Sequence, residues 1–175
     1  MKTKCFLLPK WKSGYAWSSL FFFTVALLVF ILDQGSKFWV VRHLAPGETW
    51  PLLGNLLFLT YVRNPGAAFG IFAYKTPFFI AISFVMIILM VIAAHILPLR
   101  HLLLRCGLAV LLGGVVGNLY DRLQTGFVVD FLDLRFWPVF NLADVAIVVG
   151  VFMVVIGLSR RFGPFEQADP DQGGG

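Results

Sequence analysis

Four long apolar runs, separated by short polar stretches, set the pattern of this chain of 175 residues. They cover residues 13–41, 76–99, 101–120 and 138–159. At a rise of about 1.5 Å per residue, a helix of roughly 20 residues crosses the roughly 30 Å hydrocarbon core of a bilayer. The pattern therefore predicts a single integral membrane domain, residues 1–175, with four transmembrane helices.

Basic residues indicate how these helices are oriented. Lysines crowd the N-terminal segment 1–12, arginines occupy the connection 100–105, and Arg160 and Arg161 follow the fourth run. Four crossings place all three groups on one side, and basic residues are enriched on the cytoplasmic side of membranes. We therefore expect both termini in the cytoplasm, with residues 160–175 as a disordered tail. Acidic residues outside that tail fall at the opposite ends of the helices, so we expect the chemistry at the outer face.

The first outer connection, residues 42–75, is long enough to hold structure of its own. Residues 56–63 are rich in aromatic and β-branched side chains, residues 64–66 break this pattern, and residues 67–72 resume it. Such a sequence predicts a strand, a turn and a second strand on the membrane surface. The second outer connection, residues 121–137, matches no motif that we can interpret. The expected fold class is therefore an all-α membrane protein with a small β element on its outer face.

The composition agrees with a membrane protein and narrows its partners. The chain is 59% hydrophobic and only 13% charged, about half the charged share of a soluble domain. Its net charge of +5 comes from basic residues at the ends of apolar runs. This distribution favours membrane lipid, and not nucleic acid, as a partner. Cys5 and Cys106 both fall on the expected cytoplasmic side, where no disulfide is expected.

Two aspartates, Asp130 and Asp144, occupy surroundings that are otherwise poor in charge. Only the uncharged segment 145–159 separates Asp144 from Arg160, and as a helix it spans about 22 Å. The fourth helix must therefore begin before Asp144 and hold this carboxylate inside the membrane boundary, which is costly and marks a candidate functional site. Two carboxylates that share a site cannot both ionise readily. One can then take a proton from water while the other polarises a peptide carbonyl, a pairing that hydrolyses amides.

Other interpretations of these aspartates stay open at this point. Each is also explained as a cap at a helix N-terminus, where the helix dipole favours an acid. Intramembrane carboxylates serve as proton relays in transporters too, but there we expect them near the bilayer midplane and together with inverted repeats, which we do not find. A noncatalytic scaffold would leave the clustered Asn, Asp and Arg residues unexplained.

Three further charged residues are expected to have structural roles. Asp33 and Lys37 lie four positions apart in the first helix, a spacing at which opposite charges pair. Asp121 stands at the outer end of the third helix, beside Arg122. We expect all three residues to form charge pairs that stabilise the ends of helices.

Three asparagines, Asn64, Asn118 and Asn141, are of a different kind. A neutral amide beside a carboxylate pair can orient it or bind the backbone of a substrate. Turn and cap chemistry explains Asn64, which precedes Pro65, but explains Asn118 poorly. No metal-ligand spacing such as His-Glu-x-x-His or paired Cys-x-x-Cys occurs, and no serine has the partners of a triad. Neither a metal nor another cofactor is therefore expected.

Five blocks of these residues, taken together, resemble the lipoprotein signal peptidase family (signal peptidase II), the intramembrane aspartic proteases of bacteria. The blocks occur in the order of the family across residues 33–144, and the five in order are far more specific than any one of them. They are Asp33-Gln-Gly-Ser-Lys37, Asn64-Pro-Gly-Ala-Ala-Phe-Gly70, Gly114-Val-Val-Gly-Asn-Leu-Tyr-Asp-Arg122, Val129-Asp-Phe131 and Phe140-Asn-Leu-Ala-Asp144.

The resemblance implies a site and a substrate. Asp130 and Asp144 are the implied catalytic dyad. The implied substrate contacts are Asn64, Gly66, Asn118, Arg122 and Asn141. The implied substrate is a prolipoprotein in the bacterial inner membrane that carries a diacylglyceryl group on its future first cysteine and is cut just before that cysteine. The β element is implied to form a cradle over the site, the cyclic peptide globomycin is an expected inhibitor, and an enzyme of this size is expected to act as a monomer.

Overall fold

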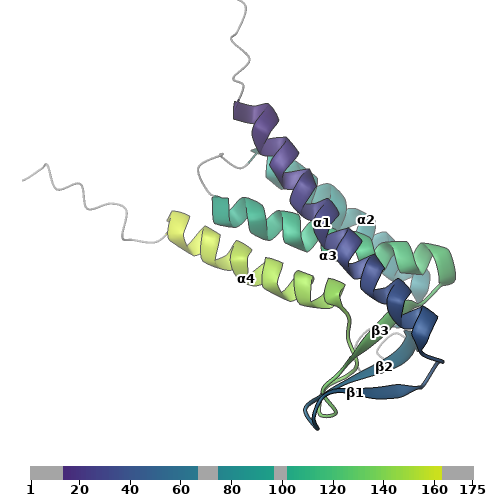
Figure 1. The fold of residues 1–175 in the computed structure, drawn as a ribbon. Coiled ribbons are helices and arrows are strands. Elements are labelled where there is room, and N and C mark those ends of the chain that lie inside the picture. The colour runs from purple at the N-terminus through teal and green to yellow at the C-terminus, as the bar shows by residue number, and fades with distance from the viewer. Residues whose placement is uncertain (1–13, 67–74, 97–101, 163–175) are drawn as a thin grey trace, which may run out of the picture.

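The computed structural model describes residues 14–66, 75–96 and 102–162, which contain four helices and three strands (Figure 1). In chain order these are α1 (Gly14–His43), β1 (Thr49–Leu53), β2 (Leu57–Asn64), α2 (Thr76–Ile96), α3 (Leu102–Thr125), β3 (Val128–Asp133) and α4 (Leu142–Phe162). All four of these helices are long and apolar enough to cross a membrane. The predicted fold class, a four-helix membrane protein with a small β element, is confirmed.

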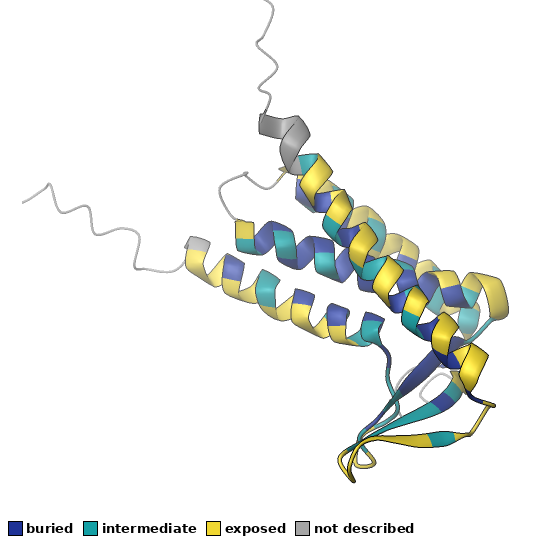
Figure 2. Cartoon of the chain, viewed as in Figure 1, coloured by how far each residue is buried: buried dark blue, intermediate teal, exposed yellow. Residues whose placement is uncertain are grey.

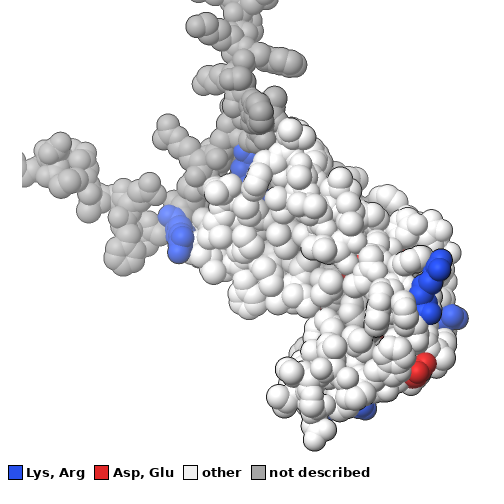
Figure 3. Space-filling view, in the orientation of Figure 1, with Lys and Arg blue, Asp and Glu red and all other residues white. Residues whose placement is uncertain are grey.

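The central helix of the bundle is α3. Most of its residues are buried against its neighbours, whereas the other three helices turn most of theirs outward (Figure 2). Many of the outward side chains are large and apolar, such as Leu28 on α1, Leu89 on α2 and Phe152 on α4, and each of these three is more than half exposed. On the face in Figure 3, charged surface atoms gather toward the two ends of the molecule. Apolar surface between charged ends suits a protein whose middle is surrounded by hydrocarbon.

Glycines let α3 and α4 approach closely. A Cβ at Gly114 would lie 2.5 Å from the carbonyl oxygen of Ala143, and one at Gly150 would lie 2.7 Å from the backbone nitrogen of Leu111. Neither position has room for a side chain. Small residues are favoured at such contacts because membrane helices associate through close packing. The first turn of α4, which carries Asp144, is therefore held firmly against α3.

The three strands form one antiparallel sheet in the order β1-β2-β3, so β2 is the central strand. Val62 of β2 is paired with Asp130 of β3. The sheet lies where α1 and α3 end and where α4 begins, which we call the sheet end of the bundle (Figure 1). A buried apolar cluster joins the sheet to the last turns of α1 and consists of Val40, Leu44, Tyr61, Val129 and Phe131.

The pairing of the strands differs from the sequence-based prediction. The strand predicted at residues 56–63 corresponds to β2, but β2 pairs with β1 and β3. Its predicted partner, residues 67–72, lies outside the described residues. β3 comes from the connection 121–137, in which no strand was expected. Its two valines and one phenylalanine favour a strand, but its partner β2 precedes two helices in the chain, and local patterns carry no record of such a distant pairing.

Two helix boundaries also differ from expectation. α3 continues to Thr125, although the third apolar run was expected to end at residue 120. The added turn contains Asp121 and Arg122, and both side chains have partners within the protein, so the helix continues past these charges. α4 begins at Leu142, later than expected, because the residues before it pair with β3.

Candidate active site

A cavity of about 360 Å³ lies at the sheet end of the bundle, among residues of α2, α3, α4 and strands β2 and β3. Both Asp130 and Asp144 line it. Four of the five residues implied as substrate contacts also line it, namely Asn64, Gly66, Asn118 and Arg122. The fifth, Asn141, is fully buried and contacts both aspartates. The fold thus brings the candidate dyad and its candidate neighbours to one place.

Asp144 is held by the way in which α4 begins. The backbone N–H of Asn141 donates to Asp144 Oδ2 at 3.2 Å, and the backbone N–H of Asp144 donates to Asn141 Oδ1 at 2.9 Å. This reciprocal pattern is a capping box, in which two side chains satisfy the free N–H groups of a helix start. The other oxygen, Asp144 Oδ1, accepts a hydrogen bond from Asn118 Nδ2 at 2.8 Å. The position at the positive end of the helix dipole favours a negative charge on Asp144.

Asp130 has a different setting, since it lies in β3 and is only 2% exposed. Asn64 Nδ2 donates to its Oδ2 at 2.8 Å, and Asn141 Nδ2 donates to its Oδ1 at 2.6 Å. Burial raises the pKa of Asp130 to about 7. The negative charge of Asp144 also raises this pKa, whereas the two amide donors lower it. Both protonation states of Asp130 are therefore accessible near neutral pH.

Asn141 joins the two carboxyl groups. Its backbone N–H donates to Asp144, while its side-chain amide donates to Asp130. The interpretation of both aspartates as helix caps does not hold for Asp130, because this residue lies in a strand. Asp144 is a capping residue that also lines the cavity. Turn and cap chemistry explains part of the role of Asn64 and Asn141, but each of them also donates to a carboxylate.

Arg122 brings a positive charge to the cavity wall. Its Nη2 donates to the carbonyl oxygen of Gly66 at 3.1 Å, and its guanidinium carbon lies 4.8 Å from the ring centroid of Phe79 on α2. These contacts hold the segment after β2 against α3. A guanidinium group has five N–H donors, so further donors remain for a bound peptide carbonyl.

Behind the cavity lies a buried ion cluster made of the three residues with expected structural roles. Lys37 contacts Asp33 at 2.8 Å, as the spacing of the two residues predicted, and also contacts Asp121 at 2.8 Å. The other oxygen of Asp33 accepts the backbone N–H of Ala143 at 2.9 Å, so the cluster ties α1 to both α3 and α4. Gln34, which the sequence analysis did not single out, donates to both carboxylates. In the described part of the chain, His, Cys, Asp and Glu side chains form no group of three or more that could hold a metal ion.

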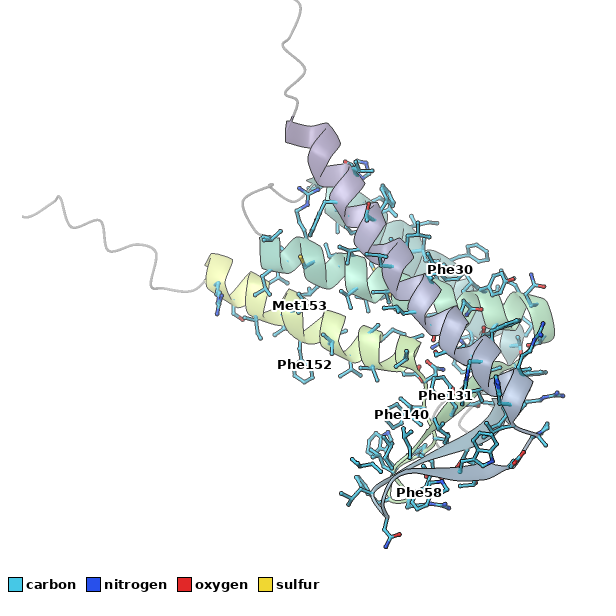
Figure 4. All side chains as sticks on the ribbon, in the orientation of Figure 1. Phe30, Phe58, Phe131, Phe140, Phe152 and Met153 are labelled. Carbon is cyan, nitrogen blue, oxygen red and sulfur yellow. The ribbon has the colours of Figure 1, made fainter. Side chains whose placement is uncertain are left out.

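Several further residues of the cavity wall were not predicted from the sequence. Ser83 on α2 lines the cavity, and its position as a polar residue within an apolar run could have marked it as a candidate site residue. Trp137 and Phe140 come from the connection between β3 and α4, and Figure 4 places Phe140 near the start of α4. A second, mainly apolar cavity of about 320 Å³ adjoins the first, since Asp144 and Phe140 line both. Asp144 therefore lies between the cavity that it shares with Asp130 and a more apolar one.

Comparison with known proteins places this site in a family. The family model described as Signal peptidase (SPase) II matches residues 25–160. The chain belongs to the signal peptidase II family. The lipoprotein signal peptidase of Moorella thermoacetica is 51% identical over 133 residues, which cover 76% of this chain and 89% of that protein. The lipoprotein signal peptidase of Pelotomaculum thermopropionicum is 41% identical over 139 residues, which cover 79% of this chain and 91% of that protein.

Solved structures agree with membership of the signal peptidase II family. A bacterial membrane enzyme determined by the in meso method at 2.3 Å resolution matches with a TM-score of 0.77 and 30% identity, over 93% of this chain and 94% of that one. A second bacterial membrane enzyme, at 1.9 Å, matches with a TM-score of 0.72 and 31% identity, over 90% of this chain and 97% of that one. As a member of the signal peptidase II family, the protein is a bacterial membrane protease of lipoprotein processing.

Proposed function

We propose that this protein cuts diacylglyceryl-modified prolipoproteins just before the lipidated cysteine and uses Asp130 and Asp144 as its catalytic dyad. The observation that carries the proposal is the placement of both carboxyl groups on one cavity, joined by Asn141. Burial, together with the charge of Asp144, raises the pKa of Asp130 to about 7. A carboxyl pair in such surroundings holds one shared proton near neutral pH, which is the state that the reaction needs.

The reaction begins with one ionised and one protonated carboxyl group. The ionised group takes a proton from water, and the water oxygen adds to the carbonyl carbon of the scissile peptide bond. The protonated group gives its proton to the carbonyl oxygen, so that a gem-diol forms. When the carbon–nitrogen bond breaks, the nitrogen takes the proton held by the first group, and one hydroxyl of the diol returns a proton to the second. The dyad ends in its starting protonation state, and no bond to the protein forms.

The walls of the site offer binding surfaces for both parts of such a substrate. Arg122 has N–H donors beyond those used on Gly66 and Asn118, and these suit the carbonyl groups of an extended peptide. Asp144 also lines the second, apolar cavity, and the walls of that cavity offer hydrocarbon surface to the diacylglyceryl group. In this proposal Asn64, Gly66, Asn118, Arg122 and Asn141 shape the site around the peptide.

The charge distribution supports an orientation in which the sheet end faces the outside. The lysine-rich segment 1–12 and the pair Arg160 and Arg161 are then cytoplasmic, in agreement with the positive-inside rule. Substrate reaches the dyad from the outer part of the bilayer, and the sheet forms a cradle beside it. The enzyme acts as a monomer in this proposal, and globomycin blocks the dyad.

The test uses purified wild type, Asp130→Asn and Asp144→Asn in detergent with a diacylglyceryl-modified prolipoprotein, and follows the product by gel shift. We expect cleavage by wild type, in the presence or absence of a chelator, and none by either variant, because each substitution removes a charge with little change in volume. Asp133→Asn is the matched control, since Asp133 lies in the same strand but does not line the cavity, and it should cut normally.

Two results would count against the proposal in different ways. Cleavage by Asp130→Asn or by Asp144→Asn would remove that residue from the dyad. An inert wild type, tested with a substrate that a known signal peptidase II cuts, would reject the proposed activity. The transporter interpretation of the buried carboxylates would then be tested next.

A further inference from the structure

A buried lysine lies directly behind the candidate dyad. Lys37 of α1 is 3% exposed, and its Nζ contacts Asp33 Oδ2 and Asp121 Oδ2, each at 2.8 Å. A third contact, at 3.0 Å, runs to Oδ1 of Asn118. An ammonium group has three N–H donors, so these three contacts use all of them. Two carboxylates already compensate the charge of Lys37 and already tie α1 to α3, so the contact with Asn118 requires a separate explanation.

The contact with Lys37 decides which way the amide of Asn118 faces. Lys37 can only donate hydrogen bonds, so the amide must turn its oxygen toward the lysine. The amide nitrogen then faces the dyad, where it donates to Asp144 Oδ1 at 2.8 Å. Asn141 Nδ2 also donates to Asn118 Oδ1, at 3.2 Å, which supports the same orientation. Without Lys37, the amide keeps only the longer contact from Asn141 to hold this orientation. A rotated amide would present its oxygen to Asp144, an arrangement that suits only a protonated carboxyl group.

The two carboxyl groups of the dyad have unequal surroundings. Asp144 is partly exposed, begins a helix, and receives the donor that Lys37 orients. Asp130 is 2% exposed in a strand and receives the amides of Asn64 and Asn141. The helix start and the oriented donor favour a negative charge on Asp144. Burial opposes a negative charge on Asp130 and outweighs the two amide donors, which favour it.

We propose that Lys37 is a positioning residue that acts through Asn118, holds a donor on Asp144, and so makes Asp144 the ionised and Asp130 the protonated member of the dyad. The inference rests on the proposed function and deepens it, because it states which aspartate acts as the general base and which as the general acid. Asp144 then takes the proton from water, and Asp130 donates its proton to the peptide carbonyl. The ion pairs of Lys37 with Asp33 and Asp121 keep the ammonium group in place for this role.

Among the other groups near the dyad, Asn141 Nδ2 makes a longer contact to the same amide oxygen of Asn118, at 3.2 Å, and carries no charge. Arg122 on α3 donates to the carbonyl oxygens of Gly66 and Asn118. Asp33 on α1 and Asp121 on α3 are paired with Lys37 itself. The residues that α2 and β2 bring to the cavity, Ser83 and Asn64, carry no charge. The positive charge of Lys37 also lowers the pKa of Asp130, so its removal is expected to move the titration of the dyad to higher pH.

The main test compares wild type with Lys37→Met, a substitution of similar length that removes both the charge and the donors. We expect kcat to fall at least about tenfold with KM within about threefold, as is usual for the loss of a group that orients a catalytic one. We also expect the pH–kcat profile to move upward by about one unit. Lys75→Met, which removes the same charge from an exposed position just before α2, is the control and should leave kcat and the profile unchanged.

Asn118→Leu tests the path of the effect. This substitution removes the amide that links Lys37 to Asp144, and it leaves the ion pairs of Lys37 with Asp33 and Asp121 in place. The double variant Lys37→Met/Asn118→Leu should therefore lose no more activity than the more severe single variant. Because Lys37→Met leaves two buried carboxylates unpaired, Lys37→Met/Asp121→Asn is prepared in parallel, and it retains the net charge of the wild-type cluster. We expect the same loss of kcat in that variant.

A second readout does not depend on cleavage. The carboxyl carbon of Asp130, labelled with carbon-13 and assigned by comparison with Asp130→Asn, can be titrated by NMR in the purified protein without substrate. We expect a midpoint near 7 in wild type. In Lys37→Met the Asp130 carbon should be partly ionised already below that midpoint, because the shared proton then divides between Asp130 and Asp144. An inert wild type would reject the proposed activity while this titration still tests the role of Lys37.

Three outcomes would overturn the inference. Folded Lys37→Met with unchanged kcat and an unchanged pH profile would leave Lys37 with a structural role only. Losses that multiply in the double variant with Asn118→Leu would show that the two residues act independently. Failure of both Lys37 variants to accumulate as folded protein would assign the residue to stability.

Discussion

Asp130 gives the protein a pH dependence that can be predicted at the scale of one residue. Burial, assisted by the charge of Asp144, raises its pKa from 3.8 to about 7. Between these two values the folded protein binds a proton that the unfolded chain does not bind. The stability that comes from this proton is fully present below about pH 4 and is lost as the pH rises through about 7.

Replacement of Asp130 by Asn should therefore stabilise the protein at high pH. We expect Asp130→Asn to unfold at a higher temperature than wild type at pH 8, by up to about 4 kcal/mol in free energy, because a shift of about three pKa units is removed. The difference should shrink as the pH falls toward 4 and disappear below the ordinary pKa of 3.8, where the wild-type carboxyl group is protonated in both states. Thermal unfolding in detergent between pH 4 and pH 8 measures this.

Glu48 provides a control of opposite sign for that measurement. Its pKa is lowered by the backbone N–H of Ala45 and by the indole N–H of Trp50, and it is fully exposed. A lowered pKa contributes stability above the ordinary value that is lost as the pH falls. Glu48→Gln should therefore be slightly less stable than wild type at pH 8. An Asp130→Asn variant that is no more stable than wild type at pH 8 would contradict the raised pKa.

At the scale of an element, the first turn of α4 combines a helix cap with the candidate chemistry. Asn141 accepts the backbone N–H of Asp144 as a cap and donates to Asp130 with the same amide group. The glycines that bring α4 close to α3 keep this turn beside Asn118. One short sequence therefore both starts a helix and positions a carboxylate.

Two substitutions of Asn141 should separate these roles. Asn141→Ala loses the cap and should lower the free energy of unfolding by about 1 kcal/mol. Asn141→Ser keeps a hydroxyl that can cap the helix, so most of this stability should return. Neither variant has the amide donor to Asp130, and we expect kcat to fall roughly ten- to hundredfold in both. Unfolding temperatures and cleavage rates measure the two effects, and full activity in Asn141→Ser would show that the cap alone matters.

At the scale of the whole molecule, the arrangement predicts which side of the membrane each end of the bundle faces. All residues of the candidate site gather at the sheet end, and the basic end of α4 lies at the other end of the bundle (Figure 1). In a variant without its two native cysteines, Asn55→Cys marks the sheet and Ser159→Cys marks the last turns of α4. A membrane-impermeant maleimide added to intact spheroplasts should label Asn55→Cys at once, and Ser159→Cys only after lysis. The reverse pattern would contradict the proposed orientation.

Much of this fold could be predicted from local patterns. An apolar run of about 20 residues, a charged end and a break at Pro65 are each contained in a short stretch of sequence. The pair Asp33–Lys37 could be predicted in the same way, since a helix places residues four apart on one face. β3 could not, because a strand with a distant partner leaves only a weak local signal.

The candidate site likewise has features that the sequence predicts and features that depend on the folded structure. Asp130 and Asp144 could be recognised from the sequence as costly charges in an apolar chain, because that cost depends on neighbours along the chain. That Asn141 joins them and that Lys37 contacts Asn118 became evident from the folded chain. The physical reason is that hydrogen bonds depend on distances of about 3 Å and on direction. Such geometry between residues on different helices and strands exists only after the chain has folded.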